Sequence, residues 1–245
     1  MNAEVVVRAS GVVMKFGGVT AVDGASMYLR RGELRCLIGP NGAGKSTFFK
    51  CLSGQLAPTE GEILLQGGSI AGMNLHNVAR LGVGVKTQVP SLMNGLTVRE
   101  NIWLSANAVR QRSRAEVDAR VDQVVEQIGL GAFLKRTAGA LAHGQRQLVE
   151  LGVVLARDPW LVLLDEPAGG LTSDEVHRMA SLVRALTAQA TVVVVEHDMN
   201  FVRDIAETVT AFHRGRILAE GSADAVLSNE SVRDVYLGRA ARAKP

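Results

Sequence analysis

Long apolar runs, aromatic residues and cysteines are all scarce in this chain of 245 residues. Its longest apolar stretches, Trp160–Leu164 and Thr191–Val195, fall well short of the roughly 20 residues that a membrane-spanning helix needs. The first ten residues carry Glu4 and a short valine run instead of a basic stretch followed by a long apolar one, which argues against a secretory signal. We therefore expect a cytoplasmic protein without a segment that crosses a membrane.

The two cysteines, Cys36 and Cys51, lie in apolar contexts without metal-ligand spacing, so we expect reduced thiols in the core rather than a disulfide or a zinc site. Aromatic residues make up 4% of the chain, hydrophobic residues 47% and charged residues 21%, which is ordinary for a folded globular protein and excludes a disordered one. The net charge of +3 is small, and Lys and Arg are spread among acidic residues. This charge pattern gives no support for a nucleic-acid partner.

Strand signals dominate the first third of the chain. Apolar and polar residues alternate in Val5–Val7, Ala25–Leu29 and Glu62–Gln66, with glycine-containing turns between them, which predicts short and partly antiparallel strands. Leu34–Ile38 runs into a glycine-rich segment and then into the helix-like Lys45–Leu52. A strand, a loop and a helix in this order indicate the start of an α/β core.

Helical signals replace the strand signals from about Leu92 to Arg157. Ser113 and Glu116 fit a capping box, and Gly129 would end the helix that they begin. We interpret this stretch as a mostly helical insert inside one α/β domain.

Strand character returns after this insert. It appears at Trp160–Leu164 and at Thr191–Glu196, with a helical pattern at Ser173–Leu186 between them, which predicts a βαβ unit in a parallel sheet. The predicted domain spans residues 1–240, with 1–88 and 158–240 as the core and its β subdomain, 89–157 as the helical subdomain and 241–245 as a tail.

The segment Gly39–Ser46 matches the pattern G-x-x-x-x-G-K-S/T, and it lies between a predicted strand and a predicted helix, as a phosphate-binding loop must. Glycines let backbone N–H groups close on phosphate oxygens, and the following helix presents its positive end to them. Lys45 would reach the β- and γ-phosphates, Ser46 would bind Mg²⁺, and Thr47 would contact the α-phosphate. The predicted nucleotide-binding residues are Asn41, Gly42, Ala43, Gly44, Lys45, Ser46 and Thr47.

Acidic residues follow both buried strands of the second half. Asp165 and Glu166 come at the end of an aliphatic strand, where open α/β sheets bind ligands. Asp165 fits the acid that holds magnesium, and Glu166 is our choice for the base that polarises the attacking water. His197 follows the next strand and is placed to bond the γ-phosphate. The sequence therefore predicts an ATP and Mg²⁺ site with two catalytic side chains at this edge.

Taken together, these residues resemble the ATP-binding cassette family over nearly the whole chain. The resemblance implies a P-loop cassette with a mixed RecA-like core, an N-terminal antiparallel β subdomain and an inserted helical subdomain. It implies that Gln88 senses Mg²⁺ and the attacking water, and that Phe16, before two glycines, stacks on adenine.

Leu141 to Gln145 looks like the family signature, usually Leu-Ser-Gly-Gly-Gln, which in the family reaches the γ-phosphate held by a second cassette. The resemblance therefore adds Ala142, His143, Gly144 and Gln145 to the nucleotide-binding set. Ala142 replaces the serine and His143 a glycine, while the backbone N–H of Gly144 remains for the anion. Thr172 is neutral where the family usually has an aspartate between the two sites. These departures favour a heterodimer with a different cassette.

Finer resemblance points to the uptake branch for branched-chain amino acids and related small solutes, closest to its urea-type members. It rests on segments such as Thr47–Lys50, Ala79–Pro90, the His143 signature and Glu196–Val202. The resemblance implies transmembrane permease subunits, contacted around Val89–Glu100, and indirectly a periplasmic solute-binding protein. It also implies a peripheral location on the cytoplasmic face of the inner or plasma membrane.

Three alternatives remain open. Another P-loop enzyme, such as a GTPase or a small-molecule kinase, would leave the signature segment and His197 unexplained. A non-transport ABC ATPase that acts on DNA or ribosomes would usually carry a coiled coil or a second cassette. A regulatory, weakly hydrolysing cassette is disfavoured by Glu166 and His197.

Overall fold

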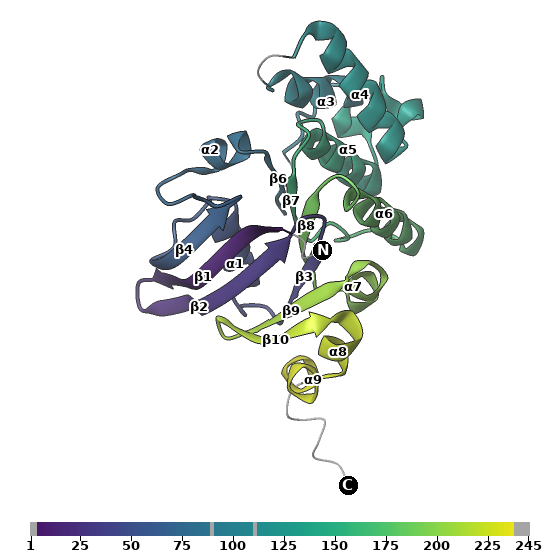
Figure 1. Cartoon of the computed structure of the whole chain (residues 1–245). Helices are drawn as coiled ribbons and strands as arrows, with labels where there is room; N and C mark the ends of the chain where they lie inside the picture. The colour runs from purple at the N-terminus through teal and green to yellow at the C-terminus, as the bar shows by residue number, and fades with distance from the viewer. Residues whose placement is uncertain (1–3, 89–90, 110–111, 238–245) are drawn as a thin grey trace.

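The computed structural model describes residues 4–88, 91–109 and 112–237. Its strands form two sheets (Figure 1). Val89 and Pro90 of the predicted permease contact, and the predicted tail 241–245, lie outside these residues. None of the helices in the described ranges combines the length and the apolar character that crossing a membrane requires.

The first sheet is antiparallel, with four strands in the order β2-β1-β4-β5. Its strands are β1 (Val5–Phe16), β2 (Val19–Arg30), β4 (Glu60–Leu65) and β5 (Gly68–Ser69). The predicted antiparallel strands are therefore confirmed, but β1 and β2 are each twelve residues long. Sequence alternation located only their most regular parts because the ladder shifts register around Gly11, which breaks the two-residue period. Gln66 was wrongly placed in a strand, since it lies in the following turn with φ 49°.

The second sheet has six strands in the order β10-β9-β3-β8-β7-β6, and all neighbours except the β9–β10 pair are parallel. Its strands are β3 (Leu34–Ile38), β6 (Val83–Lys86), β7 (Leu161–Asp165), β8 (Thr191–Val195), β9 (Thr208–His213) and β10 (Arg216–Ser222). Every residue of β3, β7 and β8 is buried, as continuous aliphatic runs in a doubly covered parallel sheet require. The predicted α/β class and βαβ unit are confirmed.

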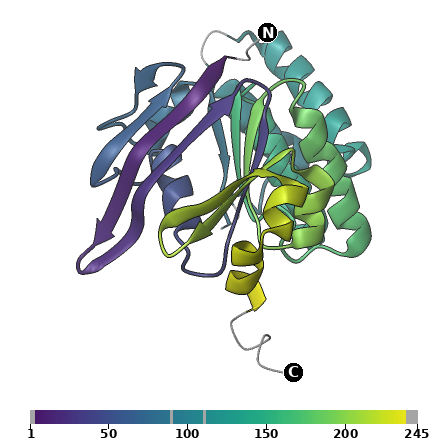
Figure 2. The ribbon, with the colours of Figure 1, turned by 60° about the horizontal axis from the view of Figure 1, so that its bottom comes forward.

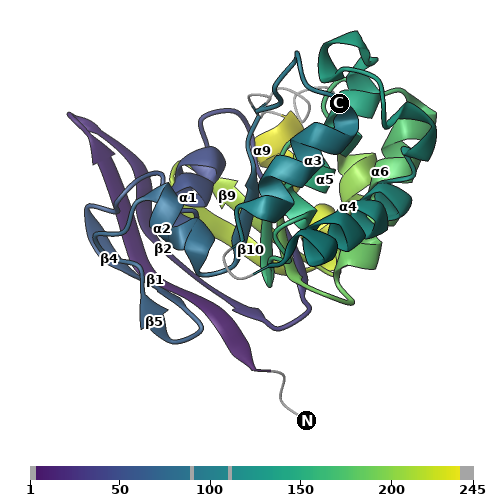
Figure 3. The ribbon, with the colours of Figure 1, turned by 90° about the horizontal axis from the view of Figure 1, so that it is seen from above.

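Helices cover this sheet and form a separate group beyond its β6 edge. They are α1 (Lys45–Leu52), α2 (Leu75–Arg80), α3 (Val98–Asn107), α4 (Arg114–Ile128), α5 (His143–Leu155), α6 (Ser173–Leu186), α7 (Met199–Ile205), α8 (Ala223–Ser228) and α9 (Glu230–Leu237). The predicted capping box of Ser113 and Glu116 begins α4, and Gly129 ends it with φ 65°. Figures 2 and 3 show the antiparallel sheet on one side of the six-stranded sheet and most helices on the other.

Two hydrophobic clusters fill the spaces on the two faces of the six-stranded sheet. On β7, Val162 and Leu164 belong to the cluster with helices α3 to α7, whereas Leu161 and Leu163 belong to the cluster with α1 and the antiparallel sheet. Cys36 lies in one cluster and Cys51 in the other, and both are free thiols, as predicted. The alternating side chains of the parallel strands thus bind the two layers to one central sheet.

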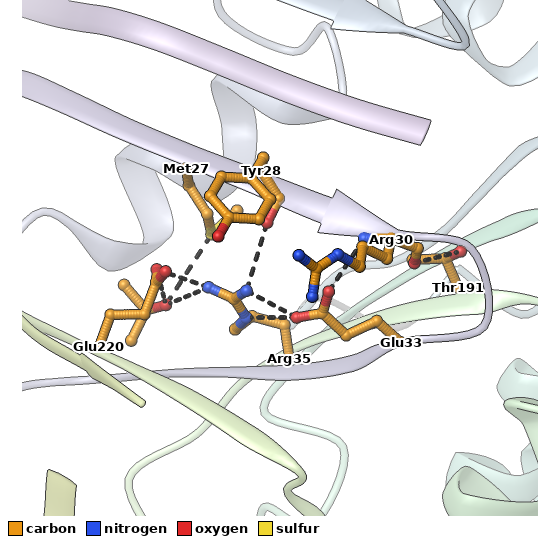
Figure 4. A network of polar contacts seen from close by, with 8 residues as sticks. Met27, Tyr28, Arg30, Glu33, Arg35, Thr191 and Glu220 are labelled. Atoms are coloured by element: carbon orange, nitrogen blue, oxygen red, sulfur yellow. Dashed lines mark hydrogen bonds and ion pairs between the residues drawn. The ribbon is translucent and has the colours of Figure 1, made fainter. Parts of the chain in front are cut away.

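Arg35 lies near the start of the central strand β3. Its guanidinium donates hydrogen bonds to Glu33 (2.8 Å), Thr210 (2.9 Å), Glu220 (2.5 Å) and the carbonyl oxygen of Tyr28 (3.2 Å). Figure 4 shows it between the two glutamates, beneath Tyr28. Arg35 is only 3% exposed, so both carboxylates compensate a cation that water does not reach. The network joins β2, β3, β9 and β10.

Candidate functional site

The candidate site lies at the opposite edge of the same sheet, where the parallel strands end. The loops that follow β3, β7 and β8 meet there because these strands are neighbours and run in the same direction. The structure therefore brings together the glycine-rich loop, Asp165 with Glu166, and His197, which lie far apart in the sequence.

Two glycines shape the loop between β3 and α1. Gly39 has φ 147°, and a side chain there would collide with the carbonyl oxygen of Phe212. Gly44 has φ 104°, and its Cβ would lie 2.5 Å from the carbonyl oxygen of Ala21. Gly44 is also the N-cap of α1, where no side chain caps the first turn. The helix thus begins with backbone N–H groups directed at the loop, which suits an anionic ligand.

Lys45 lies inside this loop and is 7% exposed. Its Nζ donates to the carbonyl oxygens of Gly39 (2.6 Å) and Pro40 (3.0 Å). Burial lowers the pKa of Lys45, while the carboxylates of Glu166 and Asp165 act in the opposite direction. The ammonium group is therefore held in place by neutral acceptors that a phosphate can replace.

A cavity of about 420 Å³ lies over the loop. Its walls come from four segments, namely Val19 to Ala21, Asn41 to Thr47, Glu166, and Arg214 with Gly215. All seven loop residues predicted to bind the nucleotide thus face one cavity. Phe16 does not line it; it is 46% exposed and pairs with Val19 at the end of the β1–β2 hairpin. The predicted adenine contact remains a prediction for a side chain at the rim.

Sequence reasoning did not find the β9–β10 turn in this cavity. Gly215 fastens the turn to the loop, because its N–H donates to the carbonyl oxygen of Ala43 (2.9 Å) and its carbonyl accepts from Asp23 (2.8 Å). A turn glycine was the only signal, and it carries no information about what the turn contacts.

A neighbouring cavity of about 290 Å³ is lined by Ser46, Gln88 and Asp165, the three predicted metal ligands, together with Phe49, Lys50, Gln55 and Thr87. Burial raises the pKa of Asp165, the charge of Glu166 adds to this, and nearby lysines oppose it. Within the described ranges, no three His, Cys, Asp or Glu side chains gather into a metal cluster. A hydroxyl, an amide oxygen and one carboxylate suit Mg²⁺, which usually takes one or two carboxylates and completes its shell with water and substrate phosphate.

Glu166 stands between the other two predicted catalytic residues. Its Oε2 accepts a hydrogen bond from Gln88 Nε2 (3.0 Å), and its Oε1 lies 3.4 Å from His197 Nδ1. The backbone of Glu166 is left-handed, with φ 47°, a conformation that costs energy for a residue with a side chain. Its side chain lines the larger cavity, whereas that of Asp165 lines the smaller one. Adjacent residues therefore serve different cavities.

Glu196 is a buried carboxylate beside the site that the sequence reasoning missed. It is 1% exposed and accepts hydrogen bonds from the backbone N–H groups of Ala168 (3.0 Å), His197 (3.0 Å) and Asp198 (3.4 Å). Burial raises the pKa of Glu196, and these bonds and the charge of His197 oppose the rise. It therefore fixes the loop that carries His197. A strand followed by three polar residues was the available signal, and it had been assigned to His197 alone.

An ion pair that the sequence reasoning also missed connects β6 with α5. Lys86 Nζ lies 3.5 Å from Glu150 Oε2, and both side chains are buried. Burial lowers the pKa of Lys86 and raises the pKa of Glu150, against their mutual attraction. Since Lys86 precedes Gln88 by two residues, this ion pair holds the helix of the signature segment against the strand that leads into the site.

The signature segment lies at the start of α5, and Ala142 is its N-cap without a side-chain hydrogen bond. Gln145 Oε1 accepts from the N–H of Ala142 (3.1 Å), and His143 Nε2 lies 3.0 Å from the carbonyl oxygen of Gly169. Residues 142–145 line neither of the two cavities. The structure of one chain thus does not bring this segment to the phosphate-binding loop.

Tyr236 of α9 is a further missed contact. Tyr236 is 36% exposed, and the partial burial of its side chain raises its pKa to about 12, although a hydrogen bond with the backbone of Gly39 acts in the opposite direction. The last described helix therefore reaches the first residue of the phosphate-binding loop. Nothing in the sequence indicated this neighbour, because 197 residues separate the two positions.

Comparisons with known proteins agree with this geometry. The family model "ABC transporter" matches residues 22–169, and the model "Branched-chain amino acid ATP-binding cassette transporter" matches residues 216–242. The chain is 34% identical to the high-affinity branched-chain amino acid transport ATP-binding protein BraF of Pseudomonas aeruginosa, over 96% of this chain and 98% of the relative. It is 33% identical to LivG of Escherichia coli, which has the same description, over 94% and 97%.

Solved structures show the same fold. An ATP-binding cassette of an ABC transporter in its ADP conformation, MJ1267, superimposes with a TM-score of 0.86 at 27% identity, covering 97% of this chain and 100% of the other. The cassette MJ0796, a dimer in a post-hydrolysis state bound to ADP and phosphate, gives 0.79 at 26% identity, over 89% and 98%. The cassette fold expected from the sequence is confirmed.

Proposed function

The chain belongs to the ABC transporter family, whose ATP-binding subunits are ATPases, and we propose that it powers the uptake of branched-chain amino acids. The observation that carries the hydrolytic part is Glu166, held by Gln88 and beside His197 at a cavity whose floor is the phosphate-binding loop. The solute rests on the names of the relatives and on the match of residues 216–242.

In the proposed mechanism, the phosphates of ATP occupy the loop and draw Lys45 away from its two carbonyl partners. Backbone N–H groups of residues 41–45 and the start of α1 surround the β-phosphate. Val19 and Phe16 then offer apolar surface to the adenine ring. Close backbone contacts at Gly39 and Gly44 fix the shape of the loop, so we expect little ordering energy to oppose binding.

Glu166 acts next, as the acceptor of a hydrogen bond from the attacking water. Gln88 and His197 hold its carboxylate from two sides, so the water meets a fixed acceptor in line with the γ-phosphorus. His197 also reaches the γ-phosphate oxygens and stabilises the charge that develops on them. Glu196 contributes indirectly because it fixes the backbone of His197.

Ser46, Gln88 and Asp165 are the residues that would hold Mg²⁺, which neutralises phosphate charge when bound. The raised pKa of Asp165 supports this role, because a cation relieves the cost of its buried negative charge.

Residues 142–145 act on a second cassette in this proposal. They lie outside the cavities of their own chain, and one similar cassette is a dimer. Ala142 offers no hydroxyl and Thr172 no charge across such an interface, so we favour a different cassette as the partner. Permease subunits would dock near residues 91–100, a periplasmic protein would deliver the solute, and the cassette would sit peripherally on the cytoplasmic side. The urea-type likeness makes urea the second candidate solute.

The test is a reconstituted complex of this chain with its partner cassette, permeases and solute-binding protein, assayed for ATP hydrolysis and solute uptake. Glu166→Gln should lower hydrolysis by about 10²- to 10⁴-fold and retain ATP binding. Leucine uptake that urea does not compete with would support the proposed solute, and the reverse would select urea. Parental hydrolysis by Glu166→Gln, or a preference for GTP over ATP, would refute the proposal.

A further inference from the structure

His143 makes a contact that the function of the signature segment does not require. Its Nε2 lies 3.0 Å from the carbonyl oxygen of Gly169, in the loop between β7 and α6. A carbonyl oxygen only accepts, so this hydrogen bond requires the hydrogen on Nε2, which also lies 3.4 Å from Gln147 Nε2. The imidazole thus fastens the start of α5 to the loop that begins with Glu166.

The same loop residue is bonded to the catalytic residue itself. The N–H of Gly169 donates to the carbonyl oxygen of Glu166 (3.2 Å). Two hydrogen bonds therefore lead from His143 through one residue, Gly169, to the backbone of Glu166. Because Glu166 is held at φ 47°, a shift of this loop changes the backbone that aims its carboxylate.

The loop is shaped around the imidazole ring. Gly170 has φ 72°, and a Cβ there would lie 3.0 Å from His143 Nε2. A histidine on the surface without neighbours would not approach the backbone of another loop so closely. The imidazole ring therefore has a defined position against Gly169 and Gly170, although His143 itself is exposed.

A second contact joins the other end of this loop to the same helix start. The carboxylate of Glu175 packs so closely against Gly144 that a side chain at Gly144 would collide with it. Glu175 is held by the N–H (2.9 Å) and the hydroxyl (3.0 Å) of Thr172. These bonds lower the pKa of Glu175, and the charge of His143 adds to the effect. Both ends of the loop 166–172 are thus tied to the signature segment.

We propose that His143 is a positioning residue that couples the signature segment to the catalytic Glu166 of its own chain. The proposal rests on the proposed function, in which residues 142–145 contact the nucleotide of a second cassette. Binding of that nucleotide then moves or fixes α5, and His143 transmits the change to Glu166 through Gly169. The neutral Thr172 transmits no charge, so the hydrogen bonds of His143 provide the link between the sites.

The test compares variants of His143 in the complete transporter complex. His143→Phe keeps a ring but removes the donor, and His143→Gln keeps an amide donor near the position of Nε2. His143→Phe should lower kcat about tenfold, a typical size for coupling between sites, with half-saturating ATP changed less than twofold. His143→Gln should retain at least half of the parental kcat. His143→Ala repeats the loss if the Phe variant does not fold.

The exposed His76 on α2 supplies the control, since His76→Phe should leave kcat unchanged. Parental kcat in His143→Phe, or an equal loss in His143→Gln, would overturn the coupling. A rise in half-saturating ATP at constant kcat would also overturn it, because His143 would then act in nucleotide binding alone and not in positioning Glu166. Glu166→Gln in the same complex separates the two failures, because parental hydrolysis there refutes the proposed function itself.

Discussion

A buried cation lies near each end of β3, and the two differ in how the surrounding protein compensates their charge. At the start of the strand, Arg35 is surrounded by Glu33, Glu220 and two further acceptors, so its charge is compensated within the protein. Beyond the end of the strand, the hydrogen bonds of Lys45 within the described part of the chain go to two backbone carbonyls, and burial lowers its pKa. One end stabilises the fold, and the other keeps a charge available for a ligand.

The buried acids extend this contrast. Asp165 and Glu196 lie at the edge of the sheet that carries the candidate site, and both have a raised pKa. Burial destabilises their charged form more than the favourable contacts with their neighbours stabilise it. Stability is therefore lower there than the packing alone would give, as is common where a site is built for binding. Substitutions at the two edges should separate stability from activity.

The largest effect is expected from Arg35→Met. It leaves Glu33 and Glu220 without their cation, and we expect the free energy of unfolding to fall by about 3 to 5 kcal/mol, measured by urea denaturation. ATP affinity of the remaining folded protein should not change. Arg31→Met is the control, because Arg31 pairs with Glu4 on the surface and should lose no more than about 1 kcal/mol. Equal losses in both variants would contradict the contrast.

Lys45→Met should weaken ATP binding and leave the stability of the fold nearly unchanged. Loss of a charge-assisted contact to phosphate, worth about 1.5 to 3 kcal/mol, should weaken ATP binding by about 10- to 100-fold in a fluorescence titration. The free energy of unfolding should change by less than about 1 kcal/mol, because the hydrogen bonds of Lys45 go to neutral carbonyl oxygens. Lys15→Met, which removes an exposed pair with Glu60, should bind ATP normally. Unfolding of the Lys45 variant would show that the two ends of β3 do not differ.

Asp165→Asn should raise stability while abolishing hydrolysis. The folded pKa of Asp165 is raised above its ordinary value of 3.8, so above that pH the native state binds more protons than the unfolded state. The contribution of Asp165 to stability therefore falls as pH rises through this window. We expect Asp165→Asn to gain about 1 kcal/mol at pH 7 and much less at pH 4, measured by denaturation without nucleotide. The exposed Asp204→Asn should show no such difference; a matching gain would refute the assignment.

The smallest effect is expected from Ala142→Ser. A serine at this N-cap can accept a hydrogen bond from the first turn of α5, which should add about 0.5 to 1 kcal/mol to stability. In the assembled transporter its hydroxyl should also lower half-saturating ATP. An exposed Ala71→Ser serves as the control. Unchanged ATP affinity and hydrolysis in Ala142→Ser would mean that the missing hydroxyl is irrelevant.

The sequence was most informative where local chemistry dictates structure. Three elements were predicted with the observed bounds, because an aliphatic run, a glycine-rich loop and a helical pattern are all local features; they are Leu34–Ile38, Lys45–Leu52 and Ser173–Leu186. The residues predicted to act in hydrolysis could be placed at one edge of the sheet because the ends of neighbouring parallel strands meet there. Strands β9 and β10 were not predicted, since β10 alternates between exposed and half-buried residues without a strong apolar pattern.

Contacts between distant residues could not be predicted. Lys86 with Glu150, Tyr236 with Gly39 and the position of the His143 ring depend on how whole elements pack, and no local pattern encodes a partner far along the chain. Glu196 was visible as a polar residue after a strand, but its three backbone partners were not. The roles of the predicted site residues remain predictions that the experiments above can decide.

The Arg35 network also limits how this chain can be recombined with others. The stretch that matches the branched-chain amino acid cassettes begins at Arg216, and its strand β10 contributes Glu220 to the buried cation. The stretch is therefore no detachable module. A chimera that exchanges this stretch would need Glu33, Arg35 and Glu220 to come from one parent. The segments to exchange should therefore be chosen by these side-chain contacts and not by sequence position alone.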